Sequence, residues 1–129
     1  MIGLKPVGIY QEMYRKAREG LPSLRDSYTD QVVGERDLVV AYMRSATPVF
    51  DVPADVTDLV DVSQTIRNGP SLLSDGEWIW RIDSIHYLAN YSLAIPSAFL
   101  DHVRAQNYRP ATDVDVSDAK FDAAISAYF

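Results

Sequence analysis

The Asp75-Gly76 pair constrains the fold of this chain more than any other feature of its sequence. It lies between two short apolar runs, and Asp-Gly in that setting is the preferred pair for a two-residue type I′ turn. The sequence therefore predicts an antiparallel β-hairpin over residues 71–81, with Leu73 opposite Trp78. Because two strands alone are only marginally stable, neighbouring helices are expected to cover one face of this hairpin.

Hydrophobic periodicity predicts a series of short helices around the hairpin. The expected segments are residues 7–19, residues 35–47, a short helix that starts near Pro53, and residues 84–92, 98–107 and 118–129. Asp83 and Ser117 are the predicted N-caps of the helices that follow them, because such side chains accept hydrogen bonds from the free N–H groups of a first turn. The helices over residues 84–92 and 98–107 are expected to pack as antiparallel neighbours.

These elements place the chain in the α+β class. With 129 residues, of which 47% are hydrophobic, it can bury a core without disulfides or metal ions. No repeat or linker divides it. We expect one mainly helical domain over residues 1–129, built around a small antiparallel β-hairpin at residues 71–81. A small sheet is the alternative if another strand lies between residues 63 and 73.

The sequence has none of the features of exported or membrane-anchored proteins. It contains no cysteine, which excludes disulfides and thiol chemistry and is typical of a reducing compartment. Its N-terminus lacks the long apolar segment of a secretory signal, and the longest apolar run, residues 38–43, is far too short to span a bilayer. We therefore expect a cytoplasmic protein that does not bind membranes.

The net charge of −6 is unevenly distributed along the chain. Residues 1–48 contain seven Lys or Arg and six Asp or Glu, whereas residues 49–129 contain five and twelve. An acidic surface repels nucleic acid and attracts basic proteins. The charge therefore argues against a nucleic-acid partner and fits either a basic protein partner or solubility alone.

Four aspartates in the predicted helix near Pro53 form the most distinctive polar feature. At about 100° per residue, Asp51, Asp55, Asp58 and Asp61 fall on one side of that helix, and valine and leucine side chains fall on the other. Like charges at this spacing cost about 0.2–0.5 kcal/mol per pair, and no basic residue lies among them. The stripe is either a solvated acidic face or a surface for a basic protein.

The residue patterns do not support catalysis or metal binding. His86 and His102 lie on different predicted helices without the spacing of a metal site, and no serine or cysteine nucleophile motif is present. The Asp113-x-Asp115 pattern fails as a calcium loop, because Asp118 stands where glycine is required. There is no glycine-rich phosphate motif, so we expect neither a cofactor nor a metal. An enzyme would instead need a pocket that joins one of the histidines to a carboxylate.

A further pattern runs from the hairpin into the two helices after it. Its residues are Asp75, Gly76, Trp78, Trp80, Arg81, Asp83, Tyr87, Tyr91, Pro96, Phe99 and Arg104. In this order, a DG-x-W-x-W-R-x-D hairpin followed by a tyrosine-bearing helix and a helix opened by proline, the segment resembles small bacterial immunity proteins encoded beside polymorphic toxins. The resemblance implies a cytoplasmic inhibitor that masks the active site of a toxin and has no catalytic residues of its own.

We therefore expect a non-catalytic protein-binding module, specifically an immunity-type inhibitor of a cognate toxin with a basic surface. The predicted contact residues belong to the acidic stripe and to the exposed face of the hairpin, and they are Asp51, Asp55, Asp58, Asp61, Glu77 and Trp80. Two alternatives stay open. One is a structural or regulatory subunit of a homo-oligomer, and the other is a small enzyme that uses dispersed Asp, His and Tyr side chains.

Overall fold

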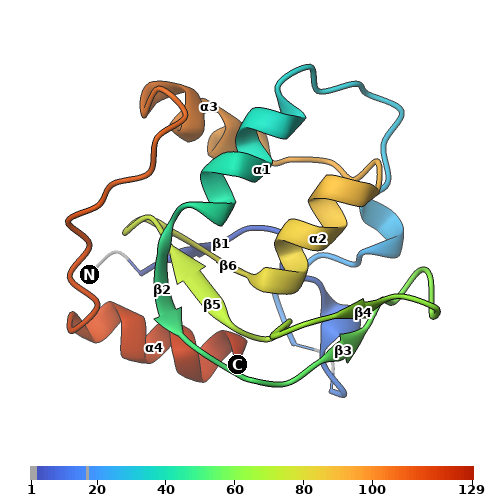
Figure 1. The fold of residues 1–129 in the computed structure, drawn as a ribbon, viewed down its shortest axis with the longest axis horizontal. Helices are drawn as coiled ribbons and strands as arrows, with labels where there is room; N and C mark the ends of the chain where they lie inside the picture. The colour runs from blue at the N-terminus through green and yellow to red at the C-terminus, as the bar shows by residue number, and fades with distance from the viewer. Residues whose placement is uncertain (1–2, 17) are drawn as a thin grey trace.

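The structure of the protein, a computed structural model, describes residues 3–16 and 18–129. Its main sheet contains, in spatial order, β1 (Lys5–Pro6), β6 (Trp78–Arg81), β5 (Leu72–Ser74) and β2 (Thr47–Phe50). Neighbouring strands are antiparallel except β1, which runs parallel to β6. A second, smaller sheet pairs β3 (Val56–Thr57) with β4 (Thr65–Ile66) in antiparallel orientation, to the right of the main sheet in Figure 1.

Helices cover both faces of the main sheet (Figure 1). One face carries α1 (Arg36–Arg44), α2 (Ile82–Asn90) and α3 (Ser97–Ala105), and the other carries α4 (Ala119–Tyr128). The connecting segments include the 3₁₀ turns η1 (Gln11–Met13) and η2 (Arg25–Ser27). Within residues 3–16 and 18–129, none of the helices is long and apolar enough to cross a membrane.

The alternation of side chains along β6 explains how both faces of the sheet become buried. Trp78 and Trp80 belong to the larger hydrophobic cluster with α1, α2 and α3, whereas Ile79 packs with α4 on the opposite face. The Trp80 indole N–H donates to the Met43 carbonyl oxygen over 3.1 Å, so the polar atom of this core residue is satisfied. The prediction that one face of the hairpin is exposed is therefore wrong, because α1, α2 and α3 cover the face with Trp80 and α4 covers the face with Ile79.

The predicted hairpin is present, but its register is shifted by two residues. Leu73 lies opposite Trp80 instead of Trp78. The turn is longer than expected because the Asp75 carboxylate accepts hydrogen bonds from the backbone N–H groups of Glu77 and Trp78, over 3.0 and 2.8 Å. These side-chain bonds replace the strand pairing that a type I′ turn would form. Since a shift by two leaves every side chain on its expected face, the burial pattern of the hairpin is unchanged.

The helix predicted over residues 7–19 is wrong for the part of that segment that the structure describes, which excludes residue 17. Gly8 adopts a left-handed backbone with φ +67° and Tyr10 is extended with φ −116°, so the helical turn is limited to η1. Residues 7–10 are all buried, and four consecutive positions would be spread around every side of a helix, so no single helical face could bury them. Tertiary burial therefore overrides the local helical pattern here.

The helix predicted near Pro53 is also wrong. Residues 51–55 are irregular, residues 56–57 form β3, and the chain then turns back into β4. Valine and aspartate both have low helix propensity, and valine favours strands, so local preference and strand pairing act in the same direction. The four aspartates consequently do not share a helical face. β4 is a strand between residues 63 and 73, but it pairs with β3 in a separate sheet, and the strands that extend the hairpin into a larger sheet are β1 and β2.

The other helix predictions are confirmed, with adjustments at their ends. α4 is capped by Asp118 and not by Ser117, since the Asp118 carboxylate accepts from the Lys120 backbone N–H over 3.0 Å. α2 starts one residue before Asp83, and Arg81 is its N-cap. α1 lies between α2 and α3 (Figure 1), so those two helices are not the antiparallel neighbours that were expected.

The fold belongs to the α+β class, but the prediction that it is mainly helical is wrong. The described residues form four α-helices and six strands, and 34% of these residues are helical while 15% are in strands. Three of these strands, β1, β3 and β4, are two residues long each. Such strands are too short to produce an alternating hydrophobic pattern, which explains why periodicity did not indicate them.

Candidate functional site

The candidate site is the turn that connects β3 to β4, residues 58–64, which we call the acidic loop. It contains two of the four predicted aspartates, Asp58 and Asp61. The loop lies at the right edge of the molecule, beside α2 (Figure 1). Its conformation depends on Asp58, which is completely buried.

Asp58 accepts four hydrogen bonds with its two carboxylate oxygens. Oδ1 accepts from the backbone N–H groups of Val60 and Asp61 over 2.7 and 3.0 Å, which closes the turn. Oδ2 accepts from the Tyr91 hydroxyl over 2.8 Å and faces Nε2 of His86 at 2.6 Å, which attaches the turn to α2. Burial alone would raise the pKa of the Asp58 carboxyl, but the hydrogen bonds together hold this pKa below its ordinary value. Asp58 is therefore an ionised anchor of the loop and not a surface carboxylate.

Further hydrogen bonds fix the rest of the acidic loop. The Tyr87 hydroxyl of α2 accepts from the Leu59 backbone N–H over 2.9 Å. Burial raises the pKa of Tyr87 to about 12, so this phenol stays protonated at neutral pH. At the far side of the loop, the Asp61 carboxylate accepts from the Ser63 hydroxyl over 2.6 Å and from the Gln64 amide over 3.0 Å. The loop is thus held in one conformation along most of its length.

The side chains that the acidic loop exposes are mainly aliphatic. Leu59 and Val60 each expose 44% of their surface, and Val62 exposes 80%. Asp51 and Asp55, in the segment before β3, are exposed as well. The loop therefore exposes an apolar tip, and exposed carboxylates precede it in the sequence. Protein interfaces similarly combine an apolar core with a polar rim.

The two remaining predicted contact residues lie on the β5–β6 hairpin. The Glu77 side chain is at the turn and is 67% exposed. Trp80 is completely buried between the sheet and its helices. Two of the six predicted residues, Asp58 and Trp80, are therefore unable to touch a partner at the surface, and their part in any interface is to support exposed neighbours.

Asp75 repeats the arrangement of Asp58 at the hairpin turn. Its Oδ1 accepts from two backbone N–H groups of its own turn. Its Oδ2 accepts from the Tyr42 hydroxyl over 2.6 Å and faces Nε2 of His102 at 2.9 Å. The Lys120 ammonium donates to the Gly76 carbonyl oxygen of the same turn over 2.7 Å. The hairpin turn is thereby attached to α1, α3 and α4.

Both histidines direct Nε2 at a buried carboxylate, and Nδ1 is the nitrogen that points away from it. Nδ1 of His102 lies 3.3 Å from a Glu77 carboxylate oxygen, and Nδ1 of His86 lies 3.4 Å from the Asn90 side-chain nitrogen. Five surface cavities, of about 320 to 620 Å³, are lined by other residues and by neither histidine. The enzyme alternative required a pocket that joins a histidine to a carboxylate. None of these five cavities is such a pocket.

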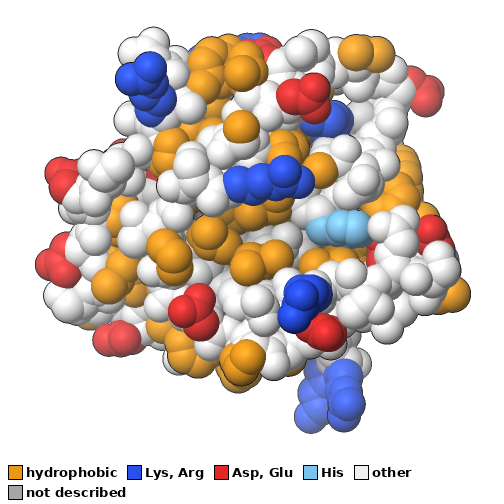
Figure 2. All heavy atoms as spheres, viewed as in Figure 1, with side chains coloured by type: hydrophobic (Ala, Val, Ile, Leu, Met, Phe, Trp, Pro, Cys, Tyr) orange, Lys and Arg blue, Asp and Glu red, His pale blue; other side chains and the backbone are white. Residues whose placement is uncertain are grey.

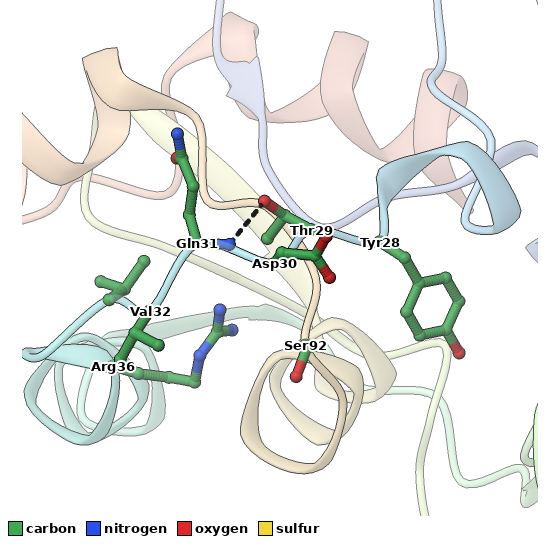
Figure 3. Close-up of a pocket in the computed structure, with 8 residues that line it drawn as sticks. Tyr28, Thr29, Asp30, Gln31, Val32, Arg36 and Ser92 are labelled. Atoms are coloured by element: carbon green, nitrogen blue, oxygen red, sulfur yellow. Dashed lines mark hydrogen bonds between the residues drawn. The ribbon is translucent and has the colours of Figure 1, made fainter.

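The largest of these cavities, of about 620 Å³, lies between residues 28–33 and the start of α1 (Figure 3). Its basic side chain, Arg36, donates to the carbonyl oxygens of Leu88 and Leu93 over 3.0 and 2.8 Å. A cation in this place satisfies one carbonyl group in the last turn of α2 and another in the segment after it, so Arg36 has a structural role. Across residues 3–16 and 18–129, no group of three or more His, Asp or Glu side chains is placed to hold a metal ion.

Sequence reasoning missed the exposure of Leu59 and Val60, which it placed on the buried side of a helix, and the anchoring roles of Asp58 and Asp75. One signal was available for the aspartates. Aspartate favours the first position of a turn, because its carboxylate bonds to N–H groups two and three residues later. The histidine and tyrosine partners of the two carboxylates have no such local signal.

Comparison with known proteins gives no match: no protein-family model, no curated protein and no solved structure is significantly similar to the chain. A function for this protein must therefore be inferred from its own residues.

Proposed function

We propose that the protein is a non-catalytic protein-binding module, an immunity-type inhibitor that neutralises a cognate toxin by masking the toxin's active site. The observation that carries this proposal is the acidic loop, which exposes Leu59, Val60 and Val62 on a turn that Asp58 holds in place. The resemblance of residues 74–104 to bacterial immunity proteins supports the same function and a cytoplasmic setting.

The rigidity of the acidic loop favours binding to another protein. Association costs about 0.5–1.5 kcal/mol for each flexible side chain that must be immobilised, and disordered loops add a further ordering cost. Here Asp58 and Tyr87 already bind the backbone of the loop in the free protein. The exposed aliphatic side chains are therefore presented in a fixed arrangement, and burying them on a partner would add hydrophobic stabilisation.

The charge of the segment that leads into β3 and the acidic loop specifies the kind of partner. Asp51 and Asp55 are exposed before β3, and residues 49–129 as a whole contain twelve acidic and five basic residues. Charges at the rim of an interface mainly steer association and select partners of opposite charge. The partner in this proposal is therefore a toxin with a basic surface around its active site, and nucleic acid is disfavoured.

The test is a calorimetric titration of the protein against the toxin encoded by the neighbouring gene, at low and high salt. The variant Asp51→Lys/Asp55→Lys reverses two exposed charges and leaves the hydrogen bonds of Asp58 intact. We expect it to weaken binding at least tenfold at low salt and less at high salt, because salt screens exposed charges. Val62→Ser should weaken binding at both salt concentrations, because it removes apolar contact area.

The matched control is Asp26→Lys/Asp30→Lys, which reverses two exposed charges that lie neither in the acidic loop nor in the segment that leads into it. It should change the affinity by less than threefold. Equal losses in the control and in Asp51→Lys/Asp55→Lys would mean that only net charge matters, and an unchanged affinity in Val62→Ser would remove the loop from the interface. Failure of the toxin to bind the wild-type protein would overturn the proposed function as a whole.

A further inference from the structure

The two histidines bind buried aspartates in the same way but differ in their second neighbour. In both rings Nε2 faces the aspartate that closes a turn, Asp58 at 2.6 Å from His86 and Asp75 at 2.9 Å from His102. The two histidine side chains are 18% and 15% exposed. In Figure 2 a histidine side chain (pale blue) reaches the surface over α2, the helix that carries His86. Because imidazole changes its charge between about pH 5 and pH 8, the group that faces Nδ1 decides which form fits the fold.

Nδ1 of His102 faces a second carboxylate. It lies 3.3 Å from an oxygen of Glu77, which belongs to the same hairpin turn as Asp75. Within the part of the chain that the structure describes, Glu77 has no other ion-pair partner. A neutral ring with its proton on Nε2 would place the lone pair of Nδ1 against this carboxylate, and two acceptors repel each other. An imidazolium has an N–H group at both nitrogens, so it donates to Asp75 and attracts Glu77 at the same time.

The remaining titratable groups around His102, on α1, α3 and α4, have partners of their own. Tyr42 on α1 and Lys120 on α4 donate to the hairpin turn over 2.6 and 2.7 Å. Arg104 on α3 pairs with two carboxylates, one of which is Asp101. Neither of these cations therefore pairs with the carboxylate that faces Nδ1.

Nδ1 of His86 faces a donor instead. It lies 3.4 Å from the side-chain nitrogen of Asn90, which also donates to the His86 carbonyl oxygen over 2.9 Å and is oriented by that bond. A neutral ring that donates from Nε2 to Asp58 can accept at Nδ1 from this amide, whereas an imidazolium would place two donors face to face. Asp58 favours a positive charge on His86 as Asp75 does on His102, so the difference between the two rings lies at Nδ1.

The other titratable groups around His86 do not supply a second carboxylate. The Asp61 carboxylate accepts from two side chains of its own loop, over 2.6 and 3.0 Å. The rings of Tyr87 and Tyr91 pack against the imidazole with centroids at 5.5 and 6.3 Å. Burial is the main cause that raises the pKa of both phenols to about 12, so they are uncharged at neutral pH. The neutral form of His86 therefore suits its surroundings.

We propose that His102 is a pH-sensitive switch at the hairpin turn: the protonated ring holds Asp75 and Glu77 together, and the neutral ring releases Glu77. His86 keeps its contacts in the neutral form, so the acidic loop stays attached over the same pH range. The contact with Glu77 stabilises the turn at the acidic end of the histidine range and is lost as the pH rises. Because Glu77 is 67% exposed, its release moves a negative charge on the surface. The switch does not depend on the proposed inhibitor function.

The test is long-range ¹H–¹⁵N correlation NMR of the two histidine rings between about pH 5 and pH 8, which shows whether each nitrogen carries a proton. We expect a larger protonated fraction in His102 than in His86 at every pH in this range. The side-chain carboxyl ¹³C signal of Glu77 should shift together with the His102 ring signals, because deprotonation of the ring releases this carboxylate.

Two reciprocal variants exchange the second neighbours. Glu77→Gln gives His102 an amide and should lower its ratio of protonated to neutral ring about two- to fivefold, the effect of a partly exposed ion pair. Asn90→Asp gives His86 a carboxylate and should raise the same ratio about twofold. The matched control is Asp101→Asn, which removes a carboxylate that is 74% exposed and points about 100° away from His102 on the helix. All three side chains are exposed, so the fold is not at risk.

The control separates the contact with Glu77 from net charge. A change at His102 in Glu77→Gln no larger than in Asp101→Asn would reduce the effect to net charge and overturn the switch. Equal protonated fractions in the two wild-type rings would refute the difference at Nδ1. A Glu77 carboxyl signal that stays constant while His102 changes its charge would show that this side chain is not released, and the switch would be refuted by that result too.

Discussion

Replacement of Asp58 is the most direct test of how the acidic loop is held. In Asp58→Ala, four donors lose their acceptor: the backbone N–H groups of Val60 and Asp61, the Tyr91 hydroxyl and the His86 ring nitrogen. Hydrogen bonds to a charged group contribute about 1.5–3 kcal/mol each, so their plain sum would reach about 6–12 kcal/mol. That sum is an upper bound, because donors in an exposed loop can bind water once the loop is released.

The expected loss of stability for Asp58→Ala is therefore about 3–5 kcal/mol, the usual cost of removing one partner from a buried charged network. Asp58→Asn keeps one carbonyl oxygen for the backbone of the turn and loses the charge that faces α2. We expect it to cost about 1–2 kcal/mol, between the alanine variant and the wild-type protein.

Urea denaturation measures these free energies of unfolding, and amide hydrogen exchange of Val60 and Asp61 reports on the loop itself. Asp55→Ala is the control, because Asp55 is exposed and such substitutions usually change stability by less than about 0.5 kcal/mol. If Asp58→Ala proved as stable as this control, or if the two loop amides exchanged no faster than in the wild-type protein, the anchoring role of Asp58 would be refuted.

Three further predictions concern other parts of the fold. Gly8→Ala should destabilise the protein by at least about 2 kcal/mol in urea denaturation, because the new Cβ atom would lie 2.9 Å from the Ser84 Cβ and the backbone is already strained at φ +67°. Gly20→Ala, at φ +83° with open space around it, should cost about 1 kcal/mol. The Arg104 guanidinium is the main cause that lowers the pKa of Glu35 to about 2. This carboxylate therefore stabilises the fold above its unfolded pKa of about 4.5, and the contribution is lost as the pH falls toward 2. In Glu35→Gln, the free energy of unfolding should depend less on pH between these two values. Trp80→Phe should cost about 1–3 kcal/mol by thermal or chemical denaturation, since it removes the indole hydrogen bond to the Met43 carbonyl oxygen, which then keeps the longer bond from the Ala46 backbone N–H, and leaves unfilled space in the core.

The parts of the fold that the sequence predicts well are those with strong local signals at both ends. α1 ends shortly before Pro48, α3 follows Pro96 directly, and both helices carry their apolar side chains at helical spacing. The hairpin is present because its burial alternates as strands require, although the Asp75 side chain lengthens the turn. In each of these segments, local preference and tertiary packing favour the same conformation, so the local sequence alone is enough to predict the element.

The failures occur where a distant contact decides the local structure. Residues 7–10 follow a strand, β1, that exists only because β6, more than seventy residues later, offers it an edge. The segment 51–61 has an equally helical pattern, yet β3 pairs with β4 and its aspartates separate into different environments. A helical wheel assigns side chains to faces correctly only where a helix forms. Residues 51–61 do not form a helix, so the faces assigned to their side chains were wrong.

The acidic loop shows why such a site resists prediction from one sequence. Asp58 could be recognised as a turn residue, but its burial depends on His86 and Tyr91, which lie 28 and 33 residues away on α2. Without His86 and Tyr91, Asp58 would be an ordinary surface aspartate. With these two partners it is buried and holds the loop in place. Exposure of Leu59 and Val60 follows from that one change, because a turn fixed by its aspartate directs the adjacent aliphatic side chains outward. The surface available to a partner is therefore determined by α2 as much as by the loop, and variants of His86 should alter the presentation of the loop without touching the interface itself.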